Sequence, residues 1–133
     1  MLLDTSFLVD LLRERARRLR GPATQKLESL GDAELELCVF VLCELLAGAE
    51  MSRDPDREIA RVTALAETYP VIYPDSAFPA LFGKTLAAVT RNGTPVPTMD
   101  LLVAVSAKRL DVPVLTRDIE HFGQVPGLRV VDY

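Results

Sequence analysis

Short apolar runs recur along the chain, separated by longer stretches in which apolar and polar residues alternate. The runs are rich in Leu, Val and Ile and are bounded by polar residues, as buried strands are. They occupy residues 2–3, 36–41, 70–73, 112–116 and 128–131. We therefore predict five buried strands.

The stretches between these runs repeat apolar residues every three to four positions, which is the spacing of a helix with one buried face. They predict helices over residues 6–20, 23–30, 42–52, 55–68, 76–91 and 98–109, with a short helical turn over 118–122. Strands that alternate with helices pair in parallel, because each helix supplies the crossover that parallel strands need. The expected fold is α/β, with a five-stranded, mostly parallel twisted sheet and helices on both faces.

Length and composition favour one domain over residues 1–133. Of these residues 49% are hydrophobic and 26% are charged, which suits a chain that buries its apolar side chains in one core. We find no internal repeat, low-complexity tract or Gly/Ser-rich linker. The amino terminus has no basic segment typical of a signal peptide, and no apolar run approaches the roughly 18 residues of a membrane span. We therefore expect a cytoplasmic protein that does not enter the membrane.

Two cysteines, Cys38 and Cys43, lie in the apolar run LCVFVLC. Nothing near them resembles a CxxC set of metal ligands. We expect both to be buried, reduced thiols in the core.

Four acidic residues stand where predicted strands end or predicted helices begin: Asp4, Glu44, Asp100 and Asp118. In an open parallel sheet, functional groups gather at the carboxyl ends of the strands, where loops and helix starts converge. Asp4 and Asp118 directly follow the first and fourth strands, and Glu44 lies early in the helix after the second. Asp100 begins the helix before the fourth strand, and it reaches the same edge if the preceding proline-containing loop draws its first turn inward.

Each acid also has a plainer interpretation. Asp4, Asp100 and Asp118 could cap helices, which stabilises a helix by about 0.5–2 kcal/mol, and Glu44 could lie on an exposed helix face. In a shared pocket, four carboxylates about 8 Å apart repel by roughly 2 kcal/mol per pair at an effective dielectric near 20, or about 12 kcal/mol in all. That repulsion is comparable to the stability of a whole domain, so such a pocket requires bound protons or divalent cations.

Oxygen ligands without accompanying His or Cys suit Mg²⁺ or Mn²⁺, which bind through a few carboxylates and a substrate phosphate. The chemistry that follows is hydrolysis of a phosphodiester bond, in which the cation polarises a phosphoryl oxygen and activates water. The single histidine, His121, is expected to be an ordinary, partly exposed residue, and it leaves little scope for a Ser-His-Asp triad. Neither GxxxxGK[ST] nor GxGxxG occurs.

The net charge of −4 argues against indiscriminate binding to nucleic acid. The run RERARRLR nevertheless places Arg13, Arg17 and Arg20 on one face of the first predicted helix. This face is either solvated or a surface that binds RNA phosphates and supplies the local attraction that the net charge lacks.

Four segments in this order resemble PIN-domain nucleases, and in particular the VapC-type toxins of prokaryotic toxin–antitoxin modules. They are LLDTSFLVDLL near the start, ELLAG in the middle, DLLVAVSA followed by VPVLTRDIEHF, and the final VPGLRVV. The resemblance covers almost the whole chain. One departure is that the family commonly has a Ser or Thr shortly before the acid of ELLAG, where this chain has VFVLCE, so no hydroxyl caps the start of that helix.

The resemblance implies that Asp4, Glu44, Asp100 and Asp118 hold one or two Mg²⁺ or Mn²⁺ ions. It implies that Thr5, Ser6 and Thr116 lend hydroxyls to water or phosphate at the ions. The implied activity is that of an endoribonuclease toxin, and the implied partners are a VapB-like antitoxin, an RNA substrate and a second copy of the chain.

Other functions remain open on the sequence alone. A catalytically silent PIN-like module could bind RNA or protein with the same fold. A DNA nuclease or a PIN domain that processes ribosomal RNA would also carry the four acids, although the short length favours the toxin.

Overall fold

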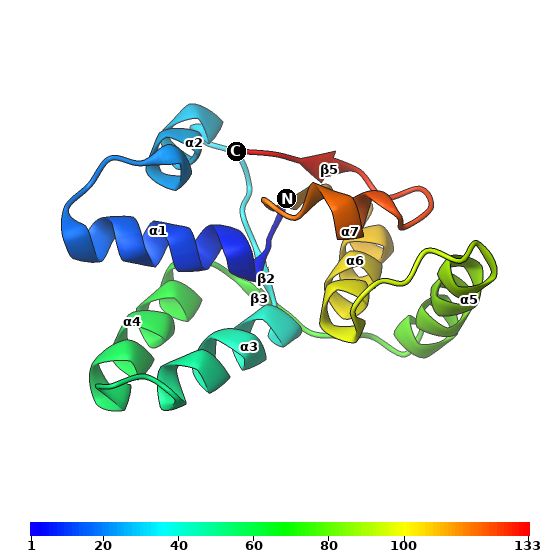
Figure 1. The fold of residues 1–133 in the computed structure, drawn as a ribbon, viewed down its shortest axis with the longest axis horizontal. Coiled ribbons are helices and arrows are strands. Elements are labelled where there is room, and N and C mark those ends of the chain that lie inside the picture. The colour runs from blue at the N-terminus through cyan, green and yellow to red at the C-terminus, as the bar shows by residue number, and fades with distance from the viewer.

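Strands and helices alternate along the chain in the computed structural model, which describes residues 1–133 (Figure 1). The strands are β1 (Leu2–Leu3), β2 (Leu37–Cys38), β3 (Val71–Ile72), β4 (Val114–Leu115) and β5 (Val130–Val131). The helices are α1 (Thr5–Arg17), α2 (Pro22–Leu30), α3 (Val39–Glu50), α4 (Pro55–Thr68), α5 (Phe78–Arg91), α6 (Thr98–Leu110) and α7 (Ile119–Gly123). Every predicted element is present in the predicted order, and the α/β class is confirmed.

All strand pairs are parallel, as the alternation of elements predicted. Strands β1, β4 and β5 form one sheet in the order β1-β4-β5, and β2 pairs with β3 in a second. One parallel bridge between Leu2 and Glu36 joins the two sheets, so the strands lie in the order β3-β2-β1-β4-β5. The prediction of a single five-stranded sheet is met only in part, because the bonding between β1 and β2 is reduced to that bridge.

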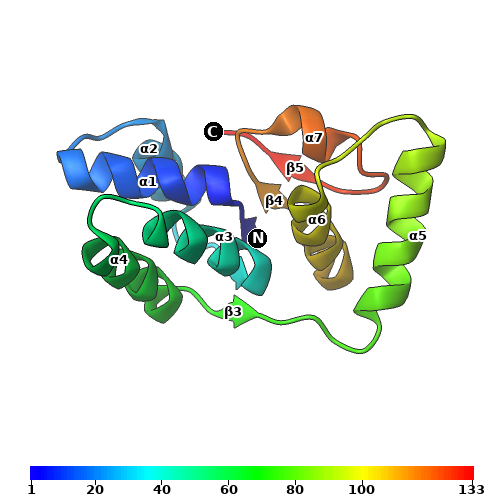
Figure 2. The same ribbon diagram turned by 60° about the horizontal axis from the view of Figure 1, so that its bottom comes forward.

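The helices cover both sides of the strands. Helices α1 to α4 lie on one side and α5 to α7 on the other (Figure 2). The buried side chains between them form one cluster, which includes Phe7 of α1, Val103 of α6 and Leu115 of β4. The helices that follow β1 lie on one side of the strands, and the helix that follows β4 lies on the other. The two connections therefore diverge, and a crevice is expected between them at the carboxyl ends of β1 and β4.

Helix α3 begins three residues earlier than its sequence suggested. The run VFV has the β-branched and aromatic residues of a strand, and we predicted a strand over 36–41. Cys38 is extended (φ −93°, ψ 155°) and precedes the first helical residue, without a side-chain hydrogen bond to cap the helix. Val41 is fully buried on the helix that follows. Burial of this face against the core therefore outweighs the local preference for a strand, and the missing hydroxyl cap is confirmed.

The two cysteines differ in burial, so the prediction that both are in the core is wrong for one of them. Cys38 is buried and Cys43 is exposed. Val41 and Leu45 face the core from α3, and Cys43 lies between them in sequence, on the opposite side of the helix. Burial raises the pKa of the Cys38 thiol. None of the seven helices has the length and apolarity that a bilayer-spanning helix requires.

Candidate active site

Asp4 is a buried carboxylate at the carboxyl end of β1, with 4% of its surface exposed. Its Oδ2 accepts hydrogen bonds from the Ser6 hydroxyl (2.7 Å), the Thr116 hydroxyl (2.8 Å) and the Ser6 backbone N–H (3.2 Å). Its Oδ1 accepts none. Asp4 is also the N-cap of α1, so the capping interpretation is correct for this residue but does not account for the free oxygen.

Thr116 connects Asp4 to Asp118 because β1 and β4 are neighbouring parallel strands. The fully buried Thr116 hydroxyl donates to Asp4 and accepts from the backbone N–H of Asp118 at 2.9 Å. The backbone N–H of Arg117 donates to the Ser6 hydroxyl at 3.2 Å. The loop after β4 is therefore fixed against the loop after β1 by hydroxyl groups.

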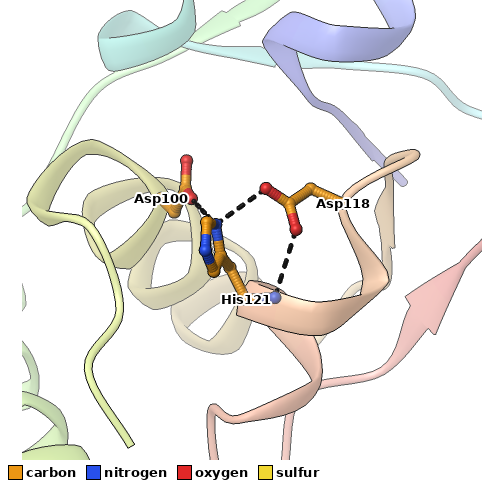
Figure 3. A group of neighbouring side chains, drawn as sticks. All are labelled: Asp100, Asp118 and His121. Carbon is orange, nitrogen blue, oxygen red and sulfur yellow. Dashed lines mark hydrogen bonds and ion pairs between the residues drawn. The ribbon is translucent and has the colours of Figure 1, made fainter.

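Asp100 and Asp118 approach the same imidazole from different elements. Nδ1 of His121 lies 3.0 Å from Oδ2 of Asp100, in the first turn of α6, and 2.7 Å from Oδ2 of Asp118, in the loop before α7 (Figure 3). Asp118 is also the N-cap of α7, where its Oδ1 accepts from the backbone N–H of His121 at 3.2 Å. Asp100 caps no helix: α6 begins after Pro97 without a side-chain cap.

Glu44 lies at the margin of this group. Its Oε2 accepts a hydrogen bond from the Thr5 hydroxyl at 2.5 Å. Thr5 follows Asp4 directly in sequence and begins α1, whereas Glu44 comes from the second turn of α3. The hydrogen bond therefore holds Glu44 beside the end of β1.

Neighbouring charges shift the pKa values of Asp100 and His121. Burial raises the pKa of Asp100, and the negative charges of Asp4 and Asp118 raise it further, against the opposing effect of His121. Partial burial lowers the pKa of His121, but the charges and hydrogen bonds of Asp118 and Asp100 outweigh this and raise it. The Thr116 hydroxyl links Asp4 to Asp118, and the His121 imidazole links Asp118 to Asp100, so carboxylates from the end of β1, from α6 and from the β4–α7 loop lie near one another.

The donor atoms of this pocket fit a divalent cation. No Lys or Arg forms an ion pair with Asp4, Glu44, Asp100 or Asp118, and the only basic group among them is the imidazole of His121. Ligand atoms of Asp100, Asp118 and His121 lie within 4.8 Å of one another. Carboxylates that are buried together need compensating positive charge, and a divalent ion provides it.

The expectation that His121 is an ordinary residue is wrong, although it is partly exposed as predicted. Its side chain contacts both Asp100 and Asp118. The sequence contained one signal for this contact: Asp118 and His121 are three residues apart, which places them on one side of a helical turn. The contact with Asp100 depends on the packing of α7 against α6 and had no sequence signal.

We predicted that Arg13, Arg17 and Arg20 share one helix face, and this prediction is wrong for Arg20. α1 ends at Arg17 because Arg18 adopts a left-handed conformation (φ 54°). Arg20 lies beyond the helix and forms an ion pair with Glu28, with Nη2 and Oε2 2.5 Å apart. Only Arg13 and Arg17 remain on the predicted face.

A groove of about 410 Å³ leads away from the acids between α1, α3 and α4. Thr5 and Glu44 lie at its end near the acids, apolar residues including Leu12 and Leu45 line it, and Arg13 and Arg17 are also among the lining residues. Asp4, Asp100 and Asp118 do not line the groove. The groove adjoins the acidic pocket because Thr5, which follows Asp4 in sequence, and Glu44 line it.

A second network, which the sequence did not reveal, connects α1 to the loop that carries Asp118. Asp10 of α1 accepts hydrogen bonds from the Arg117 guanidinium (2.5 Å) and from the Tyr133 hydroxyl (3.0 Å). The Tyr133 ring packs edge-on against Phe7, with ring centroids 5.0 Å apart. These contacts join the last residue of the chain to α1 and to the loop that carries Asp118.

Comparison with known proteins identifies relatives over nearly the full length. The family model for the PIN domain matches residues 1–128. The chain is 26% identical over 132 residues to the tRNA(fMet)-specific endonuclease VapC of Salmonella typhimurium, covering 99% of this chain and 96% of that protein. It is 24% identical over 132 residues to ribonuclease VapC1 of Haemophilus influenzae, with the same coverage of each.

Solved structures agree with this assignment. DNA-bound VapBC from Salmonella typhimurium contains a chain with a TM-score of 0.87 and 26% identity, and the match covers 98% of this chain and 96% of that one. VapBC2 from Rickettsia felis, bound to a promoter DNA fragment, gives a TM-score of 0.88 at 19% identity, covering 99% and 97%, and so shares the fold. The resemblance to VapC-type proteins is confirmed, and the chain belongs to the PIN domain family.

Proposed function

We propose that this protein is a divalent-metal-dependent endoribonuclease that acts as the toxin of a type II toxin–antitoxin module in the cytoplasm. The observation that carries the proposal is the grouping of Asp4, Asp100 and Asp118, which the Thr116 hydroxyl and the His121 imidazole connect, in a chain whose PIN domain match spans nearly its full length. The naming of its relatives as VapC ribonucleases and the TM-score of 0.87 to a VapBC chain support the same function.

In this mechanism Asp4, Glu44, Asp100 and Asp118 would hold Mg²⁺ or Mn²⁺, and the chain's own hydroxyl groups orient these acids. The chemistry that such an ion would supply is polarisation of the phosphate and activation of water. Thr116 and Ser6 hold Asp4 through its Oδ2, which leaves Oδ1 free to bind an ion. Thr5 holds one oxygen of Glu44, and the other oxygen accepts no hydrogen bond from the protein, which leaves it able to accept a proton from the attacking water.

The proposed substrate is RNA, which would approach along the groove beside the acids. Arg13 and Arg17 lie on this side of an otherwise acidic protein, and their charges would attract phosphates that the net charge of −4 repels. Arg20 is assigned no part in this surface, because it lies beyond the end of α1, does not line the groove and forms a close ion pair with Glu28. Arg13 lines the groove and forms a longer ion pair with Asp10 at 3.7 Å.

The proposed protein partner is a VapB-like antitoxin, and we propose that the toxin is a homodimer. The groove between α1, α3 and α4 is lined by apolar side chains and by Arg13 and Arg17, which suits an amphipathic segment carrying acidic residues. Co-expression with a small neighbouring reading frame, followed by size-exclusion chromatography with light scattering, tests both statements. A monomeric toxin that elutes apart from that product would contradict them.

The catalytic proposal is tested with purified protein and a set of structured RNAs. We expect cleavage with Mg²⁺ or Mn²⁺, none after EDTA, and recovery when the ion is restored. Asp4→Asn should lower the cleavage rate by at least about 100-fold, since it removes a charged ligand from the site. Asp32→Asn is the matched control, because Asp32 is exposed and has no hydrogen-bond or ion-pair partner.

Two results would contradict this function in different ways. Cleavage that survives EDTA or Asp4→Asn would rule out the metal mechanism. RNA binding without cleavage in any ion would instead indicate the catalytically silent module.

A further inference from the structure

The imidazole of His121 lies between two carboxylates of the acidic pocket, where it could bind a metal ion. Its Nδ1 lies between Oδ2 of Asp118 and Oδ2 of Asp100, at 2.7 and 3.0 Å (Figure 3). Ligands of an octahedral ion about 2.1 Å from the metal lie about 3 Å from their neighbours. Nδ1 therefore lies from each carboxylate oxygen at the spacing of adjacent ligands around one ion, and ligand atoms of the three residues lie within 4.8 Å of one another.

The imidazole is also held in place. Phe122, the next residue, is fully buried and anchors α7 in the core. The backbone N–H of His121 donates to Oδ1 of Asp118, and the other ring nitrogen, Nε2, has no hydrogen-bond partner. Nδ1–H donates to the two carboxylates; on binding an ion Nδ1 would lose this proton and, with the ring proton on Nε2, would present its lone pair to the ion.

Asp4 adds a further carboxylate oxygen beside this group. Asp4 is 96% buried and accepts hydrogen bonds only through Oδ2, so its Oδ1, which remains open to solvent, has no hydrogen-bond donor and no cationic side chain as a partner. The side chains of Asp118 and His121 are 38% and 40% exposed, so the pocket is open to an ion from solvent on that side.

We propose that Nδ1 of His121 is a ligand of the catalytic ion, together with Asp100 and Asp118, and that this nitrogen makes the site select Mn²⁺ over Mg²⁺. Imidazole nitrogen binds transition ions well, whereas Mg²⁺ prefers carboxylate, carbonyl and water oxygens. A site of carboxylates alone would discriminate less between the two ions. This inference rests on the metal site of the proposed function, but not on its substrate.

The chain offers a direct test, because His121 is its only histidine. Tag-free protein is loaded with Mn²⁺, and electron spin echo envelope modulation is used to detect nitrogen coupled to the ion. We expect the modulation typical of an imidazole ligand in the wild-type protein and its loss in His121→Asn. Mn²⁺ bound tightly without this modulation would overturn the inference.

Ion affinities give a second measurement. Binding of Mn²⁺ is followed from the free-ion resonance signal and binding of Mg²⁺ by competition. His121→Asn replaces the nitrogen with an amide whose oxygen suits Mg²⁺, so we expect the ratio of Mn²⁺ to Mg²⁺ affinity to fall about tenfold. If His121 merely oriented the carboxylates, both affinities would fall together and the ratio would stay constant. Asp32→Asn should change neither affinity.

The outcomes separate this inference from the proposed function. Nitrogen coupling with no RNA cleavage would leave the ligand assignment standing and contradict the ribonuclease. Cleavage that depends on Mg²⁺ and Mn²⁺ equally, with no nitrogen coupling, would do the reverse. Failure of Mn²⁺ to bind at all would contradict both.

Discussion

At the scale of single residues, the hydroxyl of Thr116 connects two acids of the pocket, Asp4 and Asp118. It donates to the buried Asp4 carboxylate and accepts from the backbone N–H of Asp118, at 2.8 and 2.9 Å. One fully buried oxygen thereby fixes acids that are 114 residues apart in numbering, because it stands where β1 and β4 end side by side.

Thr116→Val tests this role because it keeps the shape of the side chain and removes the hydroxyl. We expect the free energy of unfolding to fall by about 1–3 kcal/mol at neutral pH, since the Asp118 N–H loses its acceptor and the Asp4 carboxylate loses a donor. Urea denaturation measures this change. Thr116→Ser, which retains the hydroxyl and loses only a methyl group, should be less destabilising, and the opposite ranking would contradict the assignment.

At the scale of helices, α2 is capped by a residue of α1. Gly21 precedes α2 and supplies no side-chain cap. The carboxylate of Glu14 instead accepts from the backbone N–H groups of Ala23 (3.1 Å) and Thr24 (2.8 Å). A Cβ on Gly21 would overlap the Glu14 carboxylate and push it away from the helix start, whereas the φ of −89° at Gly21 suits any residue.

Glu14→Ala and Gly21→Ala should each destabilise the protein by about 1 kcal/mol, the usual cost of losing a cap. The double variant should be little worse than either single variant, because both remove the same interaction. If the losses of unfolding free energy in the two single variants add up in the double variant, as measured by urea denaturation, Gly21 stabilises the protein by another interaction.

The same cap predicts a dependence on acid. Burial raises the pKa of Glu14, but the hydrogen bonds from Thr24 and Ala23 outweigh it, and the pKa lies below its ordinary value. A lowered pKa means that the stabilisation is complete above the unfolded value of about 4.3 and is lost as the pH falls below it. The difference in stability between wild type and Glu14→Ala should therefore shrink below about pH 4.

At the scale of the whole molecule, Tyr133 contacts the first helix, α1. Tyr133, the last residue, donates to Asp10 and packs against Phe7 of α1. Asp10 also binds Arg117, next to Asp118. The position of the acidic pocket is thus secured by contacts between the start of the chain, its end and the loop after β4.

Tyr133→Phe removes the hydroxyl and keeps the ring. We expect a loss of about 1 kcal/mol near pH 8, the usual net value of one hydrogen bond. Burial raises the pKa of Tyr133, and its hydrogen bond to Asp10 and the charge of Asp10 raise it further. A raised pKa means that the stabilisation is complete below the unfolded value of about 10 and is lost as the pH rises above it.

The advantage of wild type over Tyr133→Phe should accordingly narrow above about pH 10, as measured by urea denaturation across that range. Tyr73→Phe serves as the control, because the Tyr73 side chain is 67% exposed. A constant difference between wild type and Tyr133→Phe would show that the hydroxyl is not held in its neutral form by the fold.

The sequence by itself determined the order of the elements, the parallel pairing and the placement of acids where strands end and helices begin. Hydrophobic periodicity carries this information because burial is decided locally along each strand and helix. It predicted α4 over residues 55–68 as observed. It placed the start of α3 three residues late, because VFV suits a strand as well as a buried helix face.

Only the tertiary structure decided which side chains meet. The contact of His121 with Asp100, the pairing of Arg20 with Glu28 and the network of Asp10, Arg117 and Tyr133 had no signal in the sequence. Each depends on how elements distant in the chain are positioned and rotated against one another in the packed core. That arrangement follows from the summed packing of many side chains, so the pattern of any one segment cannot specify it.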